Sequence, residues 1–259
     1  MRPTLSIATL LAMLPLVANA ASLESAEDIR KCVMANTPDE SHVQAVELIS
    51  VDRVGNERAL RAQVYGRKDG DGRRRVLVRF SEPEELVGSA FLFVEKPQGN
   101  ELVVRSPDLD GTKRVAGREM LGSVFGTDFT YEDFERLLVL NKPGKLERLA
   151  DGVVDGRDAW VLETRPVEPE HSAYERVLHY VDKQSCLLPR VEFYVPGNRL
   201  RKVLTVSPGR FRELGSVWVY SEVVMFDVRD GTRTRMIIES FDIDAEIPEE
   251  RFVIDLDSE

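Results

Sequence analysis

The sequence predicts a mostly β protein built on one large antiparallel sheet. Hydrophobic and polar residues alternate with a period of two from Val43 almost to the C-terminus, which is the pattern of strands with unlike faces. Short turns separate these runs, and they are rich in residues that tolerate a positive φ, such as Asp155-Gly156 and Asp230-Gly231. Strands joined by such turns are antiparallel neighbours. A chain of 259 residues can hold this sheet in one large domain.

Met1–Ala20 has the features of a secretory signal peptide. Arg2 supplies the positive charge, Leu5–Val17 is apolar, and Ala18-Asn19-Ala20 matches the A-x-A cleavage pattern. The apolar run is too short to span a bilayer as a helix. We therefore expect export to the periplasm, cleavage after Ala20, and a single domain over residues 21–259.

A short helix precedes the sheet. Ser25-Ala-Glu-Asp28 has the spacing of a capping box, Ile29, Cys32 and Val33 fall on one helical face, and Pro38 ends the pattern. Strands are then predicted in two series. The first comprises 43–52, 57–66, 73–80, 89–95 and 101–106, and the second comprises 145–151, 158–165, 175–182, 188–195, 200–206, 216–228 and 233–243.

Residues 107–140 lie between the two series and leave the period-two pattern. They contain the glycine- and aromatic-rich run Gly122–Phe134, in which Thr130 and Asp133 have the spacing of a helix start. An insertion of this size between strands is usually a lid, a plug or a binding segment. Two interpretations of Phe129 stay open: its ring pins the loop to the core, or it forms part of a lid over an apolar opening.

Two strands are apolar on both faces. In 216–228, Trp218, Tyr220 and Phe226 share one face, and the opposite face is also apolar. In 89–95, Phe91 and Phe93 lie opposite small and aliphatic residues. A strand of this kind is either covered on both sides or lines a cavity with one face. The alternatives are a sandwich core and a half-open barrel around an apolar cavity, with helices across it.

Composition and motifs give little support for catalysis. The net charge of −10 disfavours nucleic acid and anionic membranes as partners, and the basic clusters 73–75 and 199–202 are expected to be solvated strand ends. Ser123 stands one position too early for a G-x-S-x-G nucleophile elbow. We expect His42 to be solvated and His179 to be a packing residue. Neither a catalytic residue nor a metal or cofactor site is predicted, and an enzyme is the least favoured class.

The two cysteines, Cys32 and Cys186, allow two interpretations. An exported protein retains disulfides, and a bridge between them would close a very long loop, worth about 5 kcal/mol on the chain-entropy estimate. The alternative is two buried thiols that act as small hydrophobic side chains.

Several motifs occur in the order found in the LolA-like family of lipoprotein-sorting proteins, which this sequence resembles over residues 25–259. The run Phe125–Asp133 is similar to the family's G-S-D-F-[TS]-Y-E-D signature, with Thr127 where serine is commoner. Residues 106–110 depart from the family by lacking aromatic side chains. The other matching segments are Ser25–Ala35, Gly55-Asn-Glu-Arg58, Phe80–Leu92, Pro107–Arg114 and Leu188–Tyr194.

The resemblance implies a single large antiparallel sheet curled into an incomplete, half-open barrel, with helices covering the concave face and a cavity for acyl chains. It implies a monomeric periplasmic carrier of a lipid or lipid-modified protein, working with an inner-membrane exporter of the resistance-nodulation-division type. The alternative is a lipid-sensing module that controls a membrane partner. The candidate ligand-binding residues, as cavity lining or lid, are Phe91, Phe93, Phe125, Phe129, Tyr131, Phe134, Trp218, Tyr220 and Phe226.

Overall fold

The computed structural model describes residues 25–254, except 37, 39–40, 109–110, 139–143, 208 and 215–216. The expected signal peptide, Met1–Ala20, lies outside the described residues. Among the helices of the described part, none combines the length and the apolar character needed to cross a membrane.

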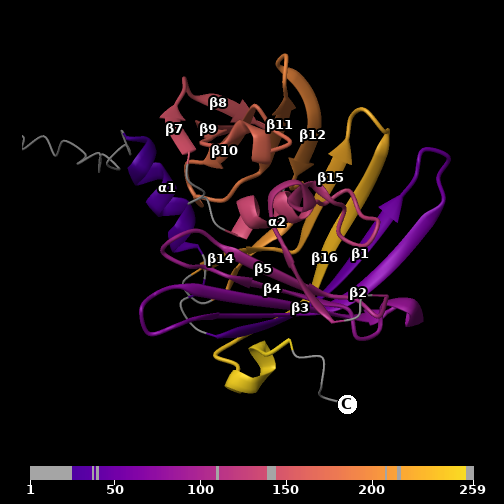
Figure 1. Ribbon diagram of the computed structural model, residues 1–259. Coiled ribbons are helices and arrows are strands. Elements are labelled where there is room, and N and C mark those ends of the chain that lie inside the picture. Colours follow the sequence, from indigo (N-terminus) through magenta and orange to yellow (C-terminus); the bar gives the residue numbers. More distant parts are fainter. Residues whose placement is uncertain are drawn as a thin grey trace, which may run out of the picture.

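Fourteen strands form one antiparallel sheet, in the order β6-β5-β4-β3-β2-β1-β16-β15-β12-β11-β10-β9-β7, with β8 paired to β9 (Figure 1). Almost all neighbours in the sheet are also neighbours in sequence. Three pairings depart from this rule: β12 pairs with β15 across the β13–β14 hairpin, β7 pairs with β9 across β8, and β1 pairs with β16, which joins the first half of the chain to the second. The sheet curls, but its edge strands β6 and β7 do not pair, so it is a half-open barrel. The predicted architecture is confirmed, and the sandwich alternative is wrong.

The strands of the first half are β1 (His42–Val51), β2 (Glu57–Lys68), β3 (Arg74–Glu82), β4 (Ala90–Val94), β5 (Glu101–Arg105) and β6 (Thr112–Val115). Those of the second half are β7 (Gly144–Arg148), β8 (Gly152–Val154), β9 (Arg157–Pro166), β10 (Arg176–Asp182), β11 (Arg190–Val195), β12 (Arg199–Thr205), β15 (Glu222–Asp227) and β16 (Thr232–Ile243). A separate hairpin contains β13 (Phe211–Leu214) and β14 (Val217–Tyr220).

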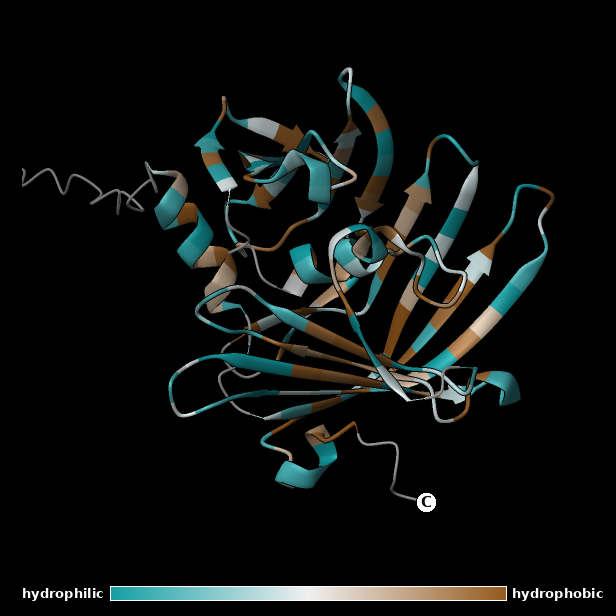
Figure 2. Ribbon diagram, in the orientation of Figure 1, coloured by the Kyte–Doolittle hydropathy of each residue, from teal (hydrophilic) through white to brown (hydrophobic). Residues whose placement is uncertain are grey.

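The turn residues behave as their chemistry predicts. Asp155, Gly156, Asn198 and Gly231 all have positive φ, at the hairpin positions where the sequence places Gly, Asn or Asp. Along the strands, hydrophobic and hydrophilic residues alternate, and the hydrophobic side chains of the inner face form the main core (Figure 2).

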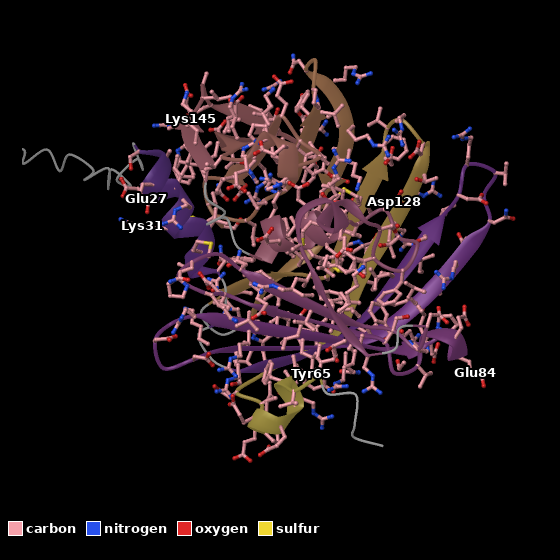
Figure 3. All side chains as sticks on the ribbon, viewed as in Figure 1. Glu27, Lys31, Tyr65, Glu84, Asp128 and Lys145 are labelled. Atoms are coloured by element: carbon pink, nitrogen blue, oxygen red, sulfur yellow. A yellow bond between two sulfur atoms is a disulfide. The ribbon has the colours of Figure 1, made fainter. Side chains whose placement is uncertain are left out.

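Both faces of β3 and β4 are covered, which explains their apolar composition. The inner face carries Phe91 and Phe93, and α2 (Tyr131–Leu138) lies across this concave side (Figure 1). On the convex side, Leu77 packs against Phe252 of the short helix η4 (Glu249–Phe252). Tyr65 lies at this convex face too, with the guanidinium of Arg251 5.3 Å from its ring centre (Figure 3).

One predicted strand is in fact two strands, which belong to different sheets. Residues 216–228 were expected to form one strand, but the chain breaks at Ser221, whose backbone N–H donates to the carbonyl of Arg210 (2.7 Å). The residues before the break belong to the β13–β14 hairpin, and those after it belong to the large sheet. The break resets the alternation of faces, so the even-numbered side chains Trp218 and Phe226 no longer lie on one surface. The short strands β6, β8 and β13 were not predicted.

The first helix, α1 (Ala26–Ala35), begins as the sequence predicts, with the Oγ of Ser25 accepting a hydrogen bond from the backbone N–H of Asp28 (3.1 Å). Its C-terminal end is fixed to the second half of the chain. Cys32 and Cys186 form a disulfide, with their Cα atoms 5.6 Å apart. Next to it, the Asn36 side chain donates to the carbonyl of Ser185 (2.6 Å) and accepts from a backbone N–H of β14 (3.1 Å).

The disulfide is tested by labelling free thiols. Denatured, non-reduced protein should bind no thiol reagent at Cys32 or Cys186, and reduction should lower the melting temperature by several degrees because the unfolded chain loses a long-range constraint. Labelling of both thiols without prior reduction would contradict the bridge. A protein reduced and blocked with a small alkylating reagent serves as the unbridged control.

Candidate functional site

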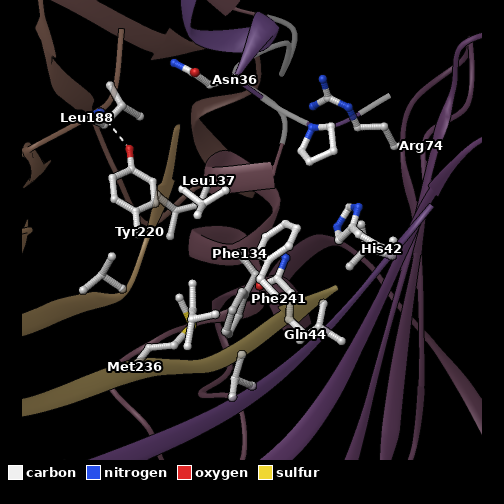
Figure 4. A pocket seen from close by; sticks show the side chains of 18 of the residues that line it. Asn36, His42, Gln44, Arg74, Phe134, Leu137, Leu188, Tyr220, Met236 and Phe241 are labelled. Atoms are coloured by element: carbon white, nitrogen blue, oxygen red, sulfur yellow. Dashed lines mark hydrogen bonds between the residues drawn. The ribbon is translucent and has the colours of Figure 1, made fainter. Parts of the chain in front are cut away.

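An apolar groove of about 270 Å³ lies between the concave face of the sheet and α2 (Figure 4). One wall comes from β1–β3, the opposite wall from β14–β16, and Phe134 and Leu137 of α2 form part of its lining. The end of α1 and the disulfide loop contribute to one side. Most of its lining is hydrophobic, including Val33, Val46, Val64, Val76, Val78, Leu188, Leu204, Val223, Met236 and Ile238.

Four of the nine predicted residues line this groove: Phe91, Phe134, Trp218 and Tyr220. They come from β4, α2 and β14, elements distant in sequence, and α2 brings them together across the concave side. Tyr220 is held in place because its hydroxyl accepts a hydrogen bond from the backbone N–H of Leu188 (2.7 Å), which Figure 4 shows as a dashed line. Burial raises the pKa of Tyr220 well above its ordinary value.

The other predicted rings lie elsewhere. Phe93 and Phe129 are fully buried in the core, and Phe125 and Tyr131 pack half-buried against it. Phe226 is a correction: its side chain is 42% exposed and does not line the groove. The break of the chain before β15 is the reason, because β15 turns its other face inward.

The signature loop, at the start of the run Phe125–Asp133, contacts two of the other motifs, Gly55–Arg58 and Phe80–Leu92. The guanidinium of Arg58, from the Gly55–Arg58 motif, donates to the carbonyl of Phe125 (2.6 Å). The ring of Phe125 meets that of Phe80 edge-on, with centroids 4.7 Å apart. Phe125 and Gly126 both have positive φ (48° and 80°), which turns the loop back toward β3. Three segments that are separate in sequence therefore meet at one place.

The acidic residues of the signature fix α2 by buried hydrogen bonds. Thr130 and Asp133 form the predicted capping box, each accepting a hydrogen bond from the other's backbone N–H (2.9 and 3.1 Å). The Asp133 carboxylate also accepts from the Tyr174 hydroxyl (2.6 Å) and from Lys202 Nζ (2.8 Å). Burial, together with the Asp133 charge, holds the pKa of Tyr174 well above its usual range. Asp133 is thus connected to β12 and to the loop before β10.

The neighbouring Glu132, which is 0% exposed, makes a second buried connection. Its carboxylate accepts from Arg136 Nη2 (2.8 Å), the Ser172 hydroxyl (2.5 Å) and the backbone N–H of Ala173 (2.9 Å). Asp128 forms a third connection, to the hydroxyls of Thr232 and Thr234 on β16. The carboxylates of Asp128, Glu132 and Asp133, of which the sequence predicted only Asp133 as a capping group, therefore connect α2 and its loop to β12, to β16 and to the loop before β10.

His179 of β10 is a buried packing residue, as predicted. Its Nε2 lies 3.1 Å from the Thr164 hydroxyl, and its Nδ1 is buried without a hydrogen-bond partner in the described residues. Burial lowers the pKa of His179 to about 3, and the charge of Arg136 acts in the same direction. The imidazole is therefore neutral at ordinary pH.

The end of the groove on β1–β3 is not apolar. His42, Lys68 and Arg74 line it. Two expectations are wrong here: His42 is buried and stacked on Phe241 (centroids 5.2 Å apart), and Arg74 is only 7% exposed instead of solvated. A third correction concerns Lys202, which is buried in its ion pair with Asp133. The turn-forming run Asp69-Gly70-Asp71-Gly72 marks the β2–β3 hairpin in the sequence, so the pairing of Lys68 with Arg74 could have been predicted by counting outward from it.

Within the described residues, no group of three or more His, Cys, Asp or Glu side chains is arranged to hold a metal ion. What the arrangement offers is a largely preformed apolar space with a few polar groups at one end, which is the general form of a site for a hydrophobic ligand.

Comparison with known proteins identifies the fold. A protein-family model described as "Uncharacterized protein" matches residues 72–254. No curated protein matches the sequence. Among solved structures, a DUF1329 family protein from Desulfovibrio piger is similar with a TM-score of 0.80 and 20% identity, over 88% of this chain and 95% of that protein.

Two further solved structures carry the predicted family in their names. A domain named for outer membrane lipoprotein sorting, from Vibrio parahaemolyticus, has a TM-score of 0.76 and 21% identity over 88% of this chain and 97% of its own. A LolA superfamily protein from Nitrosomonas europaea has a TM-score of 0.70 and 19% identity over 89% and 98%. The resemblance predicted from the motifs is confirmed at the level of the fold.

Phe129 tests which interactions hold the signature loop. Because its ring is fully buried against Phe134 (centroids 5.1 Å apart), Phe129→Ala should lower the free energy of unfolding by about 3–5 kcal/mol, measured by urea denaturation. Thr130→Ala removes one capping hydrogen bond and should cost about 1 kcal/mol. A cost for Phe129→Ala no larger than that of Thr130→Ala would show that the ring does not pin the loop.

The pH dependence of stability tests His179. Its pKa is about 3 in the folded protein and about 6.5 in the unfolded chain, so the unfolded state binds one more proton between these values. The contribution of His179 to the free energy of unfolding is therefore present in full above pH 6.5, and it falls by about 1.4 kcal/mol for each pH unit below that value. His179→Gln should flatten the curve between pH 6 and pH 4.5, while His171→Gln, at an exposed site, should not. Identical slopes in wild type and His179→Gln would contradict the assignment.

Proposed function

We propose that this protein is a carrier that binds the acyl chain of a lipid or of a lipid-modified protein. The premise is that the chain belongs to the family whose model matches residues 72–254 and has the fold of the LolA superfamily. The observation that carries the proposal is the apolar groove between the sheet and α2. Binding and release are sufficient for this function, and no covalent step is needed.

Elementary energetics explains why such a carrier needs a dry groove. Exposing a sixteen-carbon chain to water costs about 12 kcal/mol, at about 0.8 kcal/mol per methylene. The groove replaces that water with the side chains of Val46, Val64, Val76 and Leu137. Its volume of about 270 Å³ is somewhat less than twice the roughly 150 Å³ of a cavity that holds one benzene. It suits a single acyl segment in the conformation described.

The buried anchoring of α2 supports a particular mode of action. Because Asp133 and Glu132 connect the helix to the sheet through charged hydrogen bonds, α2 serves as a fixed wall and not as the moving part. This proposal places the predicted ligand-binding role on Phe91, Phe134, Trp218 and Tyr220 instead of on Phe129.

The cellular setting is part of the proposal. An exported chain would carry its ligand through the periplasm, and the family resemblance supports an inner-membrane exporter as the partner that delivers or receives the lipid. The name of the Vibrio parahaemolyticus domain, which refers to lipoprotein sorting, is consistent with a lipidated protein as cargo. Crosslinking in cells separates a carrier, whose main neighbour is a transporter, from a sensor, whose main neighbour is a regulatory membrane protein.

Lipid retention is tested by native mass spectrometry of protein purified from the periplasm. Wild type should carry a co-purified acyl lipid. Val64→Trp should carry little or none, because the indole would fill the groove that Val64 lines. The matched control is Val153→Trp, at a 64% exposed position of β8 far from the groove, which should retain lipid as wild type does.

Circular dichroism of both variants shows whether the fold survives. Equal lipid retention in a folded Val64→Trp and in wild type would contradict the groove as the binding site. Wild-type protein that carries no lipid, and takes none up from detergent-solubilised membrane lipid, would contradict the carrier function itself.

A further inference from the structure

One polar group on the wall of the groove is only half used. The hydroxyl oxygen of Tyr220 accepts a hydrogen bond from the backbone N–H of Leu188 (2.7 Å). A tyrosine hydroxyl is a donor as well as an acceptor, and no acceptor for its hydrogen lies within hydrogen-bond distance among the described residues. Both residues line the groove, and Figure 4 shows them on one side of the pocket, opposite His42 and Arg74. This side of the groove therefore offers a donor to a ligand.

The surroundings of the Tyr220 hydroxyl carry no charge. Around it, β14 and the loop that contains Leu188 contribute uncharged groove-lining residues, namely Cys186 of the disulfide, Leu187, Leu188, Trp218 and Val219. Burial raises the pKa of Tyr220, and only the hydrogen bond from Leu188 acts in the opposite direction. A buried donor that lacks an acceptor costs free energy, so a native structure that keeps one usually finds the acceptor in a water or a ligand.

Asn36 provides a second donor next to the same loop. Its side chain lines the groove, where Nδ2 donates one hydrogen to the carbonyl of Ser185 (2.6 Å) and Oδ1 accepts from the backbone N–H of Trp218 (3.1 Å). A side-chain amide has two hydrogens, and the second one is not used within the described part of the chain. Tyr220 and Asn36 thus both use their oxygen atoms on backbone N–H groups and keep a hydrogen for a ligand.

We propose that the groove binds an acyl ester, whose carbonyl oxygen accepts a hydrogen bond from the Tyr220 hydroxyl while the hydrocarbon chain lies along the aliphatic walls. The inference rests on the proposed carrier function and adds the chemical class of the ligand. An ester has acceptors only, which matches side chains that offer donors, whereas an amide would bring an N–H that itself needs an acceptor. A carboxylate would place its charge among neutral groups in an apolar site, at a large cost in desolvation.

The test uses two neutral lipids that differ only in the carbonyl group. Monopalmitoylglycerol is an ester, and hexadecyl glyceryl ether has the same head and the same chain length without the carbonyl oxygen. Each is delivered from cyclodextrin to the delipidated protein and competes with a fluorescent acyl probe, which gives its Kd. Tyr220→Phe should reduce the ratio of the ether Kd to the ester Kd by about three- to tenfold, the effect of one neutral hydrogen bond. Because the ratio compares the same two lipids in both proteins, differences in their hydration cancel.

The matched control is Tyr194→Phe. It removes a hydroxyl that donates to Glu192 (2.7 Å) on β11, outside the groove lining, and its ratio should equal that of wild type. An unchanged ratio in Tyr220→Phe, or an equal fall in Tyr194→Phe, would overturn the inference and leave the carrier function standing. Binding of neither lipid to wild type would overturn both.

Melting temperatures establish that each variant is folded before it is titrated. If Tyr220→Phe does not fold, because the N–H of Leu188 loses its acceptor, infrared spectroscopy of wild type with bound carbonyl-labelled monopalmitoylglycerol carries the test. A hydrogen-bonded ester carbonyl absorbs at a lower frequency than the same carbonyl in a hydrocarbon solvent, and the bound ester should show this lower frequency. Absorption of the bound ester at the frequency found in hydrocarbon would overturn the inference.

Discussion

The architecture depends on the buried ion pair between Asp133 of α2 and Lys202 of β12. A curled sheet with one concave apolar face must cover that face, and here the cover is a helix of eight residues. So short a helix has little stability of its own. Apolar packing alone would not fix the orientation of this helix, and the carboxylates of Asp133 and Glu132 do so by binding it to the rest of the protein. Removing one partner of such a buried pair typically lowers the free energy of unfolding by about 3–5 kcal/mol. The groove exists because the helix is held at one side of the concavity.

The sequence predicted the class of fold well because the relevant signals are local. Alternation of side chains identified most strands, turn residues with positive φ identified the hairpins, and Ser25 and Thr130 marked both helix starts correctly. The predictions that failed concerned contacts between distant parts of the sequence, or depended on a single residue. The break at Ser221 carries no strong turn signal, yet it separates Phe226 from Trp218 and sends the two rings to different surfaces.

The site was predictable only in part, for a related physical reason. Aromatic residues attracted attention as cavity lining, although large rings are just as suited to a dry core, where Phe93 and Phe129 lie. The actual walls are mostly Val, Leu, Ile and Met, which leave space where a ring would fill it. Arg74 and Lys202 look like ordinary strand-end charges in sequence. Their burial follows from which face of the strand is concave, and period-two alternation alone does not give that.

The pairing of β1 with β16 has a consequence for how the chain reaches its native state. The two strands at the centre of the sheet come from opposite ends of the sequence, so neither half can be joined to the other until the last strand is available. Contacts of such large sequence separation make folding slow, because the entropy of closing a long loop is lost before the pairing is formed. A nascent chain of this topology stays open during its synthesis. If the chain is exported as proposed, that delay is an advantage, because an unfolded chain can pass through a membrane and a folded one cannot.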